Sequence, residues 1–275
     1  MANFDGSLAD ETFNGSDESD HMEGGQGNDS LVGGGGSDLL SGGEGEDTLL
    51  GGKGKDVLSG GEGDDTLLGG DDDDVFFRDY VSESGSDLID GGNGYDTVFY
   101  KFHEIATGVT FVNTVDSGDQ YDPSDGSTDL FLNMEEVVVY GSNGNDSISG
   151  GTLRALVVSG YGDDTLVSGA GDETLSGDRG DDTFVWKAGV AAGNDKVSDL
   201  SGGDSLSFRG VALTHLQEGD DPSGLAVGQA MLGTPAGGIT MLHVRIDDSD
   251  SGLASIALQG TFGVSRLVLD GGADG

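Results

Sequence analysis

The chain has 275 residues, of which 52 are acidic and 11 are basic, so its formal net charge at pH 7 is −41. Repulsion among these charges opposes compaction and disfavours nucleic acid or an anionic membrane as a partner. Only 34% of the residues are hydrophobic and 54 are glycine, which excludes a large conventional core. The absence of cysteine excludes disulfides and thiolate metal sites.

The N-terminal stretch MANFDGSLADETFNG has neither the basic start nor the apolar region of a secretory signal peptide. No apolar run approaches the ~18 residues that a membrane-spanning helix needs. We therefore expect neither a cleavable signal nor a transmembrane segment.

Residues 24–77 form six consecutive nine-residue blocks in one register: GGQGNDSLV, GGGGSDLLS, GGEGEDTLL, GGKGKDVLS, GGEGDDTLL and GGDDDDVFF. The shared pattern is G-G-x-G-x-D-x-U-x, where U is apolar, and its positions are called first to ninth place below. Glycine readily adopts positive φ and allows close backbone approach, so we expect the first six places to form a turn. The last three places predict a very short strand with U pointing inward.

Two such half-turns close one coil of eighteen residues, so every second repeat should stack at roughly 4.8 Å, the spacing of paired strands. The eighth places would then form interior rows, which hold Leu31, Leu40, Leu49, Leu58, Leu67 and Phe76. The sixth-place aspartates would stack as well, and carboxylates this close repel unless a cation lies between them. Oxygen ligands of this kind suit Ca²⁺ rather than Zn²⁺ or copper.

The nine-residue pattern resembles the calcium-binding repeat of RTX (repeats-in-toxin) proteins, for which it is a known signature. The resemblance implies an all-β fold, a parallel β-roll (a β-solenoid), in which sixth-place aspartates and turn carbonyls hold calcium. It also implies export of the unfolded chain by type I secretion, and the C-terminal LVLDGGADG is compatible with an uncleaved export signal. We therefore expect a secreted bacterial protein, either extracellular or associated with the cell surface.

The repeat register divides the chain. Residues 1–99 form a first roll block, interrupted by four inserted residues at 78–81, and residues 100–140 form a divider of strands and loops without the repeat. Residues 141–200 form a second roll block with a closing segment, and residues 201–275 form a β-rich cap with the export signal. In both blocks together the eighth place is apolar in all fifteen repeats and the sixth is acidic in fourteen. A disordered or halophilic acidic chain has no need of such a regular pattern, so the pattern disfavours both of these interpretations.

The predicted calcium ligands at sixth places are Asp20, Asp29, Asp38, Asp47, Asp56, Asp65, Asp74, Asp87, Asp96, Asp146, Asp164 and Asp182. After Val185 a GND turn resembles the segment that commonly closes RTX rolls, and the resemblance adds Asp195 of this closing turn as a last ligand. Asp199 is a further candidate beside the closing turn. The repeat at 150–158 has Ala155 at its sixth place, so the site on that edge, which Glu173 also faces, should be weak or missing.

The resemblance implies several calcium ions, roughly ten, each with a Kd near 10⁻⁴ M as is common in extracellular modules. Millimolar calcium would then contribute about 1.4 kcal/mol per site. The sum, on the order of 14 kcal/mol, equals the net stability of an ordinary domain, so we expect the calcium-free chain to be unfolded.

The sequence favours a noncatalytic function. His21, His103, His215 and His243 are scattered, HEIAT at 103–107 is only half of the zinc-protease motif H-E-x-x-H, and G-x-S-x-G is absent. The roll begins near Met1, so we expect no enzymatic domain before it. The first hypothesis is a calcium-binding structural protein of the cell surface or extracellular matrix, as in an S-layer, fibre or adhesin, assembled through calcium bridges between copies.

Two alternatives stay open. One is a polysaccharide-binding module similar to the repeat modules of alginate epimerases, which would need exposed aromatic and basic residues in a row on one face. The other is an enzyme with a cryptic site in 100–140 or 211–275. An ice-binding roll is disfavoured, because no regular outward row of threonine and asparagine is visible.

Overall fold

The computed structural model describes residues 3–79, 85–102, 109–114, 119–121, 128–187, 190, 193–209, 215–226, 229–245, 253–260 and 267–268. Within these ranges the regular structure is β-strand apart from one 3₁₀ turn, η1 (Pro222–Gly224). The chain forms two compact units, the first from 1–102 and 113–139, the second from 103–112 and 140–275. The all-β prediction is confirmed, and no helix among the described residues has the length and apolarity to cross a membrane.

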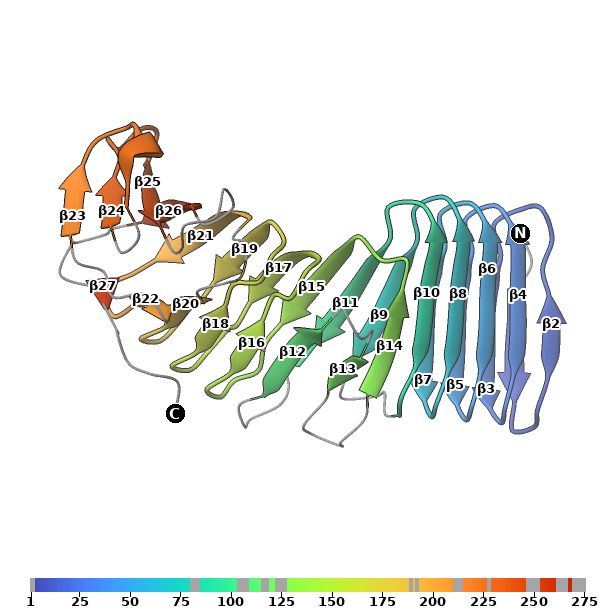
Figure 1. The fold of residues 1–275 in the computed structure, drawn as a ribbon. Helices are drawn as coiled ribbons and strands as arrows, with labels where there is room; N and C mark the ends of the chain where they lie inside the picture. The colour runs from blue at the N-terminus through green and yellow to red at the C-terminus, as the bar shows by residue number, and fades with distance from the viewer. Residues whose placement is uncertain are drawn as a thin grey trace. The chain divides into compact units, whose positions relative to one another are not determined.

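The first unit is built from two parallel sheets between which consecutive strands of the repeats alternate (Figure 1). One sheet contains, in order, β1 (Asn3–Ser7), β3 (His21–Gln26), β5 (Leu39–Glu44), β7 (Val57–Glu62), β9 (Val75–Asp79), β11 (Thr97–Lys101) and β15 (Glu136–Tyr140). The other contains β2 (Thr12–Asn14), β4 (Ser30–Gly35), β6 (Thr48–Lys53), β8 (Thr66–Asp71), β10 (Leu88–Asn93) and β14 (Thr128–Leu132), with β13 (Asp119–Tyr121) antiparallel to β14.

The register of the pairs confirms the eighteen-residue coil. In the pair β4–β6, Leu31 lies opposite Leu49, and the same offset recurs along the regular repeats. In the pair β8–β10, Leu67 lies opposite Ile89, an offset of 22 residues. The four inserted residues therefore lengthen one coil without disturbing the stacking of its strands.

The strands are longer than the three residues expected. β6 and β7 each have six residues and run from the seventh place of one repeat to the third place of the next. The expectation that the first six places form the turn is therefore wrong. Parallel pairing uses backbone groups only, so glycines extend the ladder, as Gly52 does opposite Gly70. Positive φ occurs at the second and fourth places, for example at Gly52 (114°) and Gly54 (107°).

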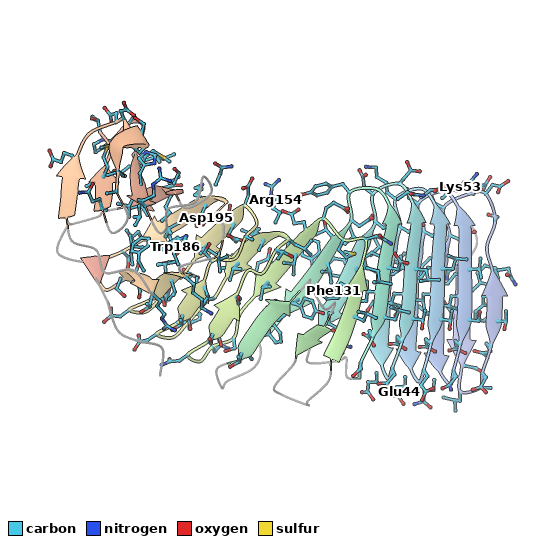
Figure 2. All side chains as sticks on the ribbon, viewed as in Figure 1. Glu44, Lys53, Phe131, Arg154, Trp186 and Asp195 are labelled. Atoms are coloured by element: carbon cyan, nitrogen blue, oxygen red, sulfur yellow. The ribbon has the colours of Figure 1, made fainter. Side chains whose placement is uncertain are left out.

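The core of the first unit is a pair of narrow rows made by the eighth places, as predicted. The side chains that are at most 1% exposed in these rows are Met22, Leu31, Leu40, Leu49, Leu58, Leu67, Phe76, Ile89 and Val98. Polar third-place residues project outward where the strands end, and Figure 2 shows Glu44 and Lys53 at opposite ends of the stacked strands. Each repeat buries one apolar side chain, so the turns have no apolar core of their own.

The second unit continues the two-sheet roll and ends in an antiparallel cap. One sheet contains β17 (Arg154–Val158), β19 (Glu173–Ser176), β21 (Asn194–Leu200), β26 (Leu253–Gly260), β25 (Ile239–Arg245), β24 (Gln229–Leu232) and β23 (His215–Glu218). The other contains β12 (Thr110–Thr114), β16 (Ser147–Ser149), β18 (Thr165–Val167), β20 (Thr183–Lys187), β22 (Ser205–Arg209) and β27 (Leu267–Val268).

The end of the second unit is an antiparallel β cap. β25 pairs antiparallel with both β24 and β26, and β26 joins the roll through parallel pairing with β21. The strands expected from the alternation at 239–246 and in ASIALQG are confirmed. The half-motif at 103–107 and the tail after Val268 lie outside the described residues.

Candidate metal centre

The sixth-place aspartates are buried and bonded to one another along each edge of the roll. The N–H of Asp29 donates to Oδ1 of Asp47 at 2.7 Å, and the N–H of Asp38 donates to Oδ1 of Asp56 at 2.8 Å. We call each such row an aspartate ladder. In the first unit the ladders contain Asp20, Asp38, Asp56, Asp74 and Asp96 on one edge and Asp29, Asp47, Asp65 and Asp87 on the other. All nine are at most 3% exposed.

The ladders continue into acidic residues that the sequence analysis did not select. The N–H of Asp87 donates to Oδ1 of Asp129 at 2.9 Å, and that of Asp96 donates to Oε2 of Glu135 at 2.8 Å. In the second unit, the N–H of Asp182 donates to Asp204 at 3.1 Å. None of the three follows the glycine pattern. Each begins an acid-x-apolar triplet, DLF, EEV or DSL, and this shorter signal would have found them.

Several ladder carboxylates have one oxygen without a hydrogen-bond partner. This holds for the Oδ2 atoms of Asp29, Asp38, Asp47, Asp56, Asp74, Asp96 and Asp164. A buried carboxylate oxygen without a donor or cation is destabilising, typically by 1–3 kcal/mol or more. The unpartnered oxygens therefore indicate where a positive charge would stabilise the fold.

The first glycine of each repeat explains where that charge would fit. A Cβ added to Gly51 would collide with Oδ2 of Asp56 and would lie 2.7 Å from the carbonyl oxygen of Gly69. A carboxylate oxygen and a carbonyl oxygen thus converge on the side of Gly51 that any other residue would fill. We call this arrangement, repeated at the other first glycines, an oxygen cradle.

The raised pKa values of the ladder aspartates also indicate that a cation would stabilise the fold. Burial raises the pKa of Asp56 to about 6 and that of Asp74 to about 7, although the ladder N–H groups of Asp38 and Asp56 act in the opposite direction. The charges of neighbouring aspartates add to the rise. Ionising these carboxyls at neutral pH therefore destabilises the calcium-free fold, and a bound cation would offset this cost.

The donor set fits a hard cation. Among the described residues no three His, Cys, Asp or Glu side chains converge on one point, so backbone carbonyls must complete any site. Carboxylate and carbonyl oxygens are the ligands of Ca²⁺, whereas Zn²⁺ prefers nitrogen and sulfur. The cradles therefore suit calcium, which would supply the missing positive charge.

In the second unit the two edges differ. The ladder of Asp146, Asp164 and Asp182 has the same bonds, 2.8 and 2.9 Å, and burial raises the pKa of Asp182 to about 7. On the other edge Ala155 pairs with Glu173, as expected from the repeat register. Burial and the adjacent Asp195 raise the pKa of Glu173 to about 9, so this carboxyl is protonated at neutral pH.

Four of the predicted ligands, Asp20, Asp87, Asp146 and Asp195, have a protein donor close to Oδ2 in addition to any ladder N–H on Oδ1. The Oδ2 atom of Asp20 accepts from the N–H and the hydroxyl of Ser16, both at 2.9 Å, and the Oδ2 atom of Asp146 accepts from the N–H of Ser142. Asp87 and Asp195 bond instead to large buried side chains, which are described below. Asp199 accepts from the hydroxyl of Ser176 and from the N–H groups of Gly177 and Asp178.

Residues 5–40, 41–76, 82–99, 138–152 and 156–184 match the family model of the RTX calcium-binding nonapeptide repeat. The chain belongs to the RTX-repeat family. RTX repeats bind calcium, so this chain is a calcium-binding β-roll protein, and the oxygen cradles are its candidate calcium sites.

Among solved structures, the chain is similar to the extracellular lipase LipA from Serratia marcescens, with 18% sequence identity and a TM-score of 0.30. The match covers 88% of this chain and 44% of the lipase, so the RTX chain spans less than half of that protein's length. A comparison with curated proteins gives no match.

Proposed function

We propose that this RTX chain is a noncatalytic, secreted structural protein that folds on binding calcium outside the bacterial cell. The observation that carries the proposal is the series of buried Oδ2 atoms without a partner, repeated coil after coil on both edges of the first unit. Burying so many carboxylate oxygens without a partner destabilises a fold at neutral pH unless cations compensate them.

The free energy that such calcium sites contribute depends on the calcium concentration, and this supports the extracellular assignment. A site with a Kd near 10⁻⁴ M contributes about 1.4 kcal/mol at millimolar calcium and close to nothing at cytosolic concentrations. The chain would therefore remain unfolded in the cytosol, which suits the type I export typical of RTX proteins, and would fold after export.

At the cell surface we assign the roll to a layer, fibre or adhesin-like matrix. Rows of exposed acidic residues, such as Glu44 and Glu62 at equivalent places of β5 and β7, offer further carboxylates through which calcium could bridge copies. Washing intact producing cells with EGTA should release the protein from their surface, whereas washing with NaCl of equal ionic strength should not. Protein that stays inside the cells, or that is released equally by both washes, would contradict the proposal.

A polysaccharide-binding module is the second candidate, and one observation favours it. Arg179 lies over the ring of Tyr161 at 5.1 Å, and both occupy exposed third places on adjacent coils of the second unit. An aromatic face beside a guanidinium suits the stacking of a sugar ring and the binding of an anionic group. A glycan array tests this candidate. Binding that is lost in Tyr161→Ala and kept in Thr165→Ala would favour the polysaccharide-binding module over the structural role.

A further inference from the structure

Two insertions of four residues interrupt the repeats, at 78–81 and at 186–189, and they have the same construction. In an ordinary repeat the strand leads into the first glycine, and the sixth-place aspartate follows five residues later. At the insertions the corresponding residues are Arg78 and Trp186, and the aspartates, Asp87 and Asp195, follow nine residues later. A large side chain therefore stands where the ordinary repeats have glycine or serine.

Arg78 directs its guanidinium into the ladder of the first unit and is only 1% exposed. Its Nη1 lies 3.0 Å from Oδ2 of Asp87, its Nε lies 3.4 Å from Oδ2 of Asp129, and its Nη2 donates to the carbonyl oxygen of Gly85 at 2.6 Å. The hydroxyl of Tyr100 also donates to Oδ2 of Asp129, at 2.6 Å. The guanidinium thus contacts two carboxylates and a carbonyl, the oxygen types that converge in a cradle.

Trp186 likewise directs a donor to a ladder aspartate in the second unit, but its indole N–H is neutral. Its Nε1 donates to Oδ2 of Asp195 at 2.7 Å, and the hydroxyl of Ser168 donates to the same oxygen at 2.8 Å. The indole is 1% exposed and stacks on Phe208 at 5.4 Å between ring centroids. Figure 2 shows the labelled Trp186 and Asp195 together in this region.

We propose that Arg78 and Trp186 take the place of a calcium ion at the two insertions, so that Asp87 and Asp195 are anchored by protein donors and hold no calcium. A divalent cation beside the permanently charged Arg78 would be strongly repelled. The indole N–H is a donor only and cannot ligate a metal. The inference rests on calcium binding by the RTX repeats and not on the extracellular role proposed above.

This assignment refines the rule read from the repeat. A sixth-place aspartate holds calcium where the first place is small enough to leave the cradle open, and it is satisfied internally where the first place carries a long donor. The insertions are then calcium-independent joints between coils, one in each unit.

Counting bound ions tests the proposal. Native mass spectrometry at saturating calcium should find the same number of ions in wild type, Asp87→Asn and Asp195→Asn. The matched substitutions Asp47→Asn and Asp164→Asn, on ladder residues whose Oδ2 has no partner, should each lose at least one ion. Loss of an ion in folded Asp87→Asn or Asp195→Asn would overturn the proposal.

A measurement on the wild type decides the matter if a variant does not fold. In crystals grown with calcium, an anomalous difference map should show peaks beside Oδ2 of Asp47 and Asp164 and none beside Oδ2 of Asp87 or Asp195. A calcium peak at either of the last two positions would overturn the proposal.

Discussion

Replacing Asp56 with asparagine should destabilise the calcium-loaded roll and stabilise the calcium-free one. Oδ1 of Asp56 accepts the N–H of Asp38, the N–H of Asp56 donates to Asp74, and both distances are 2.8 Å. Asparagine keeps Oδ1 and both ladder bonds. It replaces the unpartnered Oδ2 with an amide group that carries no charge and cannot bind a cation.

The expected loss in calcium follows from the position of Asp56 between two ladder neighbours. If the substitution weakens two sites, each contributing about 1.4 kcal/mol at millimolar calcium, the free energy of unfolding falls by about 3 kcal/mol. With a urea m-value of about 3 kcal/mol/M, the midpoint of unfolding should move down by about 1 M.

The calcium-free state should respond in the opposite direction. Burial raises the pKa of Asp56 to about 6, so at pH 7.5 the ionised carboxylate opposes folding and its removal helps. In EGTA, less trimethylamine N-oxide should then be needed to fold Asp56→Asn than wild type, since this osmolyte favours compact states.

Asp64→Asn is the matched control, because Asp64 is exposed at the fifth place of the same unit and the change in net charge is identical. Its midpoints should stay near those of wild type in both conditions. Equal effects from the two substitutions, or the same sign for Asp56→Asn with and without calcium, would refute the role assigned to the unpartnered oxygens.

Three further predictions follow from the cradle and from the pKa values. Gly51→Ala should raise the calcium concentration at the midpoint of folding, because its Cβ would collide with Oδ2 of Asp56. Gly224→Ala in the cap, where a Cβ meets nothing within 4 Å, should leave this midpoint unchanged. Equal shifts in the two variants would contradict the cradle. Glu173→Gln should leave the calcium titration unchanged, because the pKa of Glu173 is raised to about 9 and the group is already neutral at pH 7; a loss of affinity would mean that this carboxyl binds calcium. The calcium-free chain should show more β structure by circular dichroism at pH 5 than at pH 8. The pKa of Asp74 rises from 3.8 to about 7 on folding, so protonation of this carboxyl stabilises the folded state, and this stabilisation is lost as the pH rises through 7. Less β structure at pH 5 than at pH 8 would contradict the shift.

The repeat pattern predicts the parts of the fold that are local and periodic. The eighteen-residue coil, the buried row through Leu31 and Leu49, and the stacking of Asp29 below Asp47 all follow from a nine-residue period with fixed turn chemistry. These features depend on contacts between equivalent places, which the period places in register.

The extent of the strands was not predictable from the glycines, because glycine is compatible with a turn and with a parallel ladder. Asp129 was missed for a different reason. It lies 42 residues after its ladder neighbour Asp87, beyond a stretch without the repeat, so only the stacking of β14 on β10 brings the two together. The contacts of Arg78 depend likewise on the coil keeping its register while four residues are added.

The assignment of Glu173 also needed the structure. The sequence places it opposite Ala155, which suggests an isolated and dispensable carboxyl. Its N–H donates to Oδ1 of Asp195 at 3.2 Å across the second insertion, so Glu173 belongs to a buried network that the register alone did not reveal.

Circular dichroism of the purified chain with calcium, with magnesium and with EGTA at pH 7.5 tests the central claim most directly. The account predicts a β spectrum in millimolar calcium, a largely unfolded spectrum in EGTA, and poor rescue by magnesium, which demands rigid octahedral geometry and retains its waters. A β spectrum of equal strength in EGTA would show that the buried aspartates need no cation, and it would contradict the account.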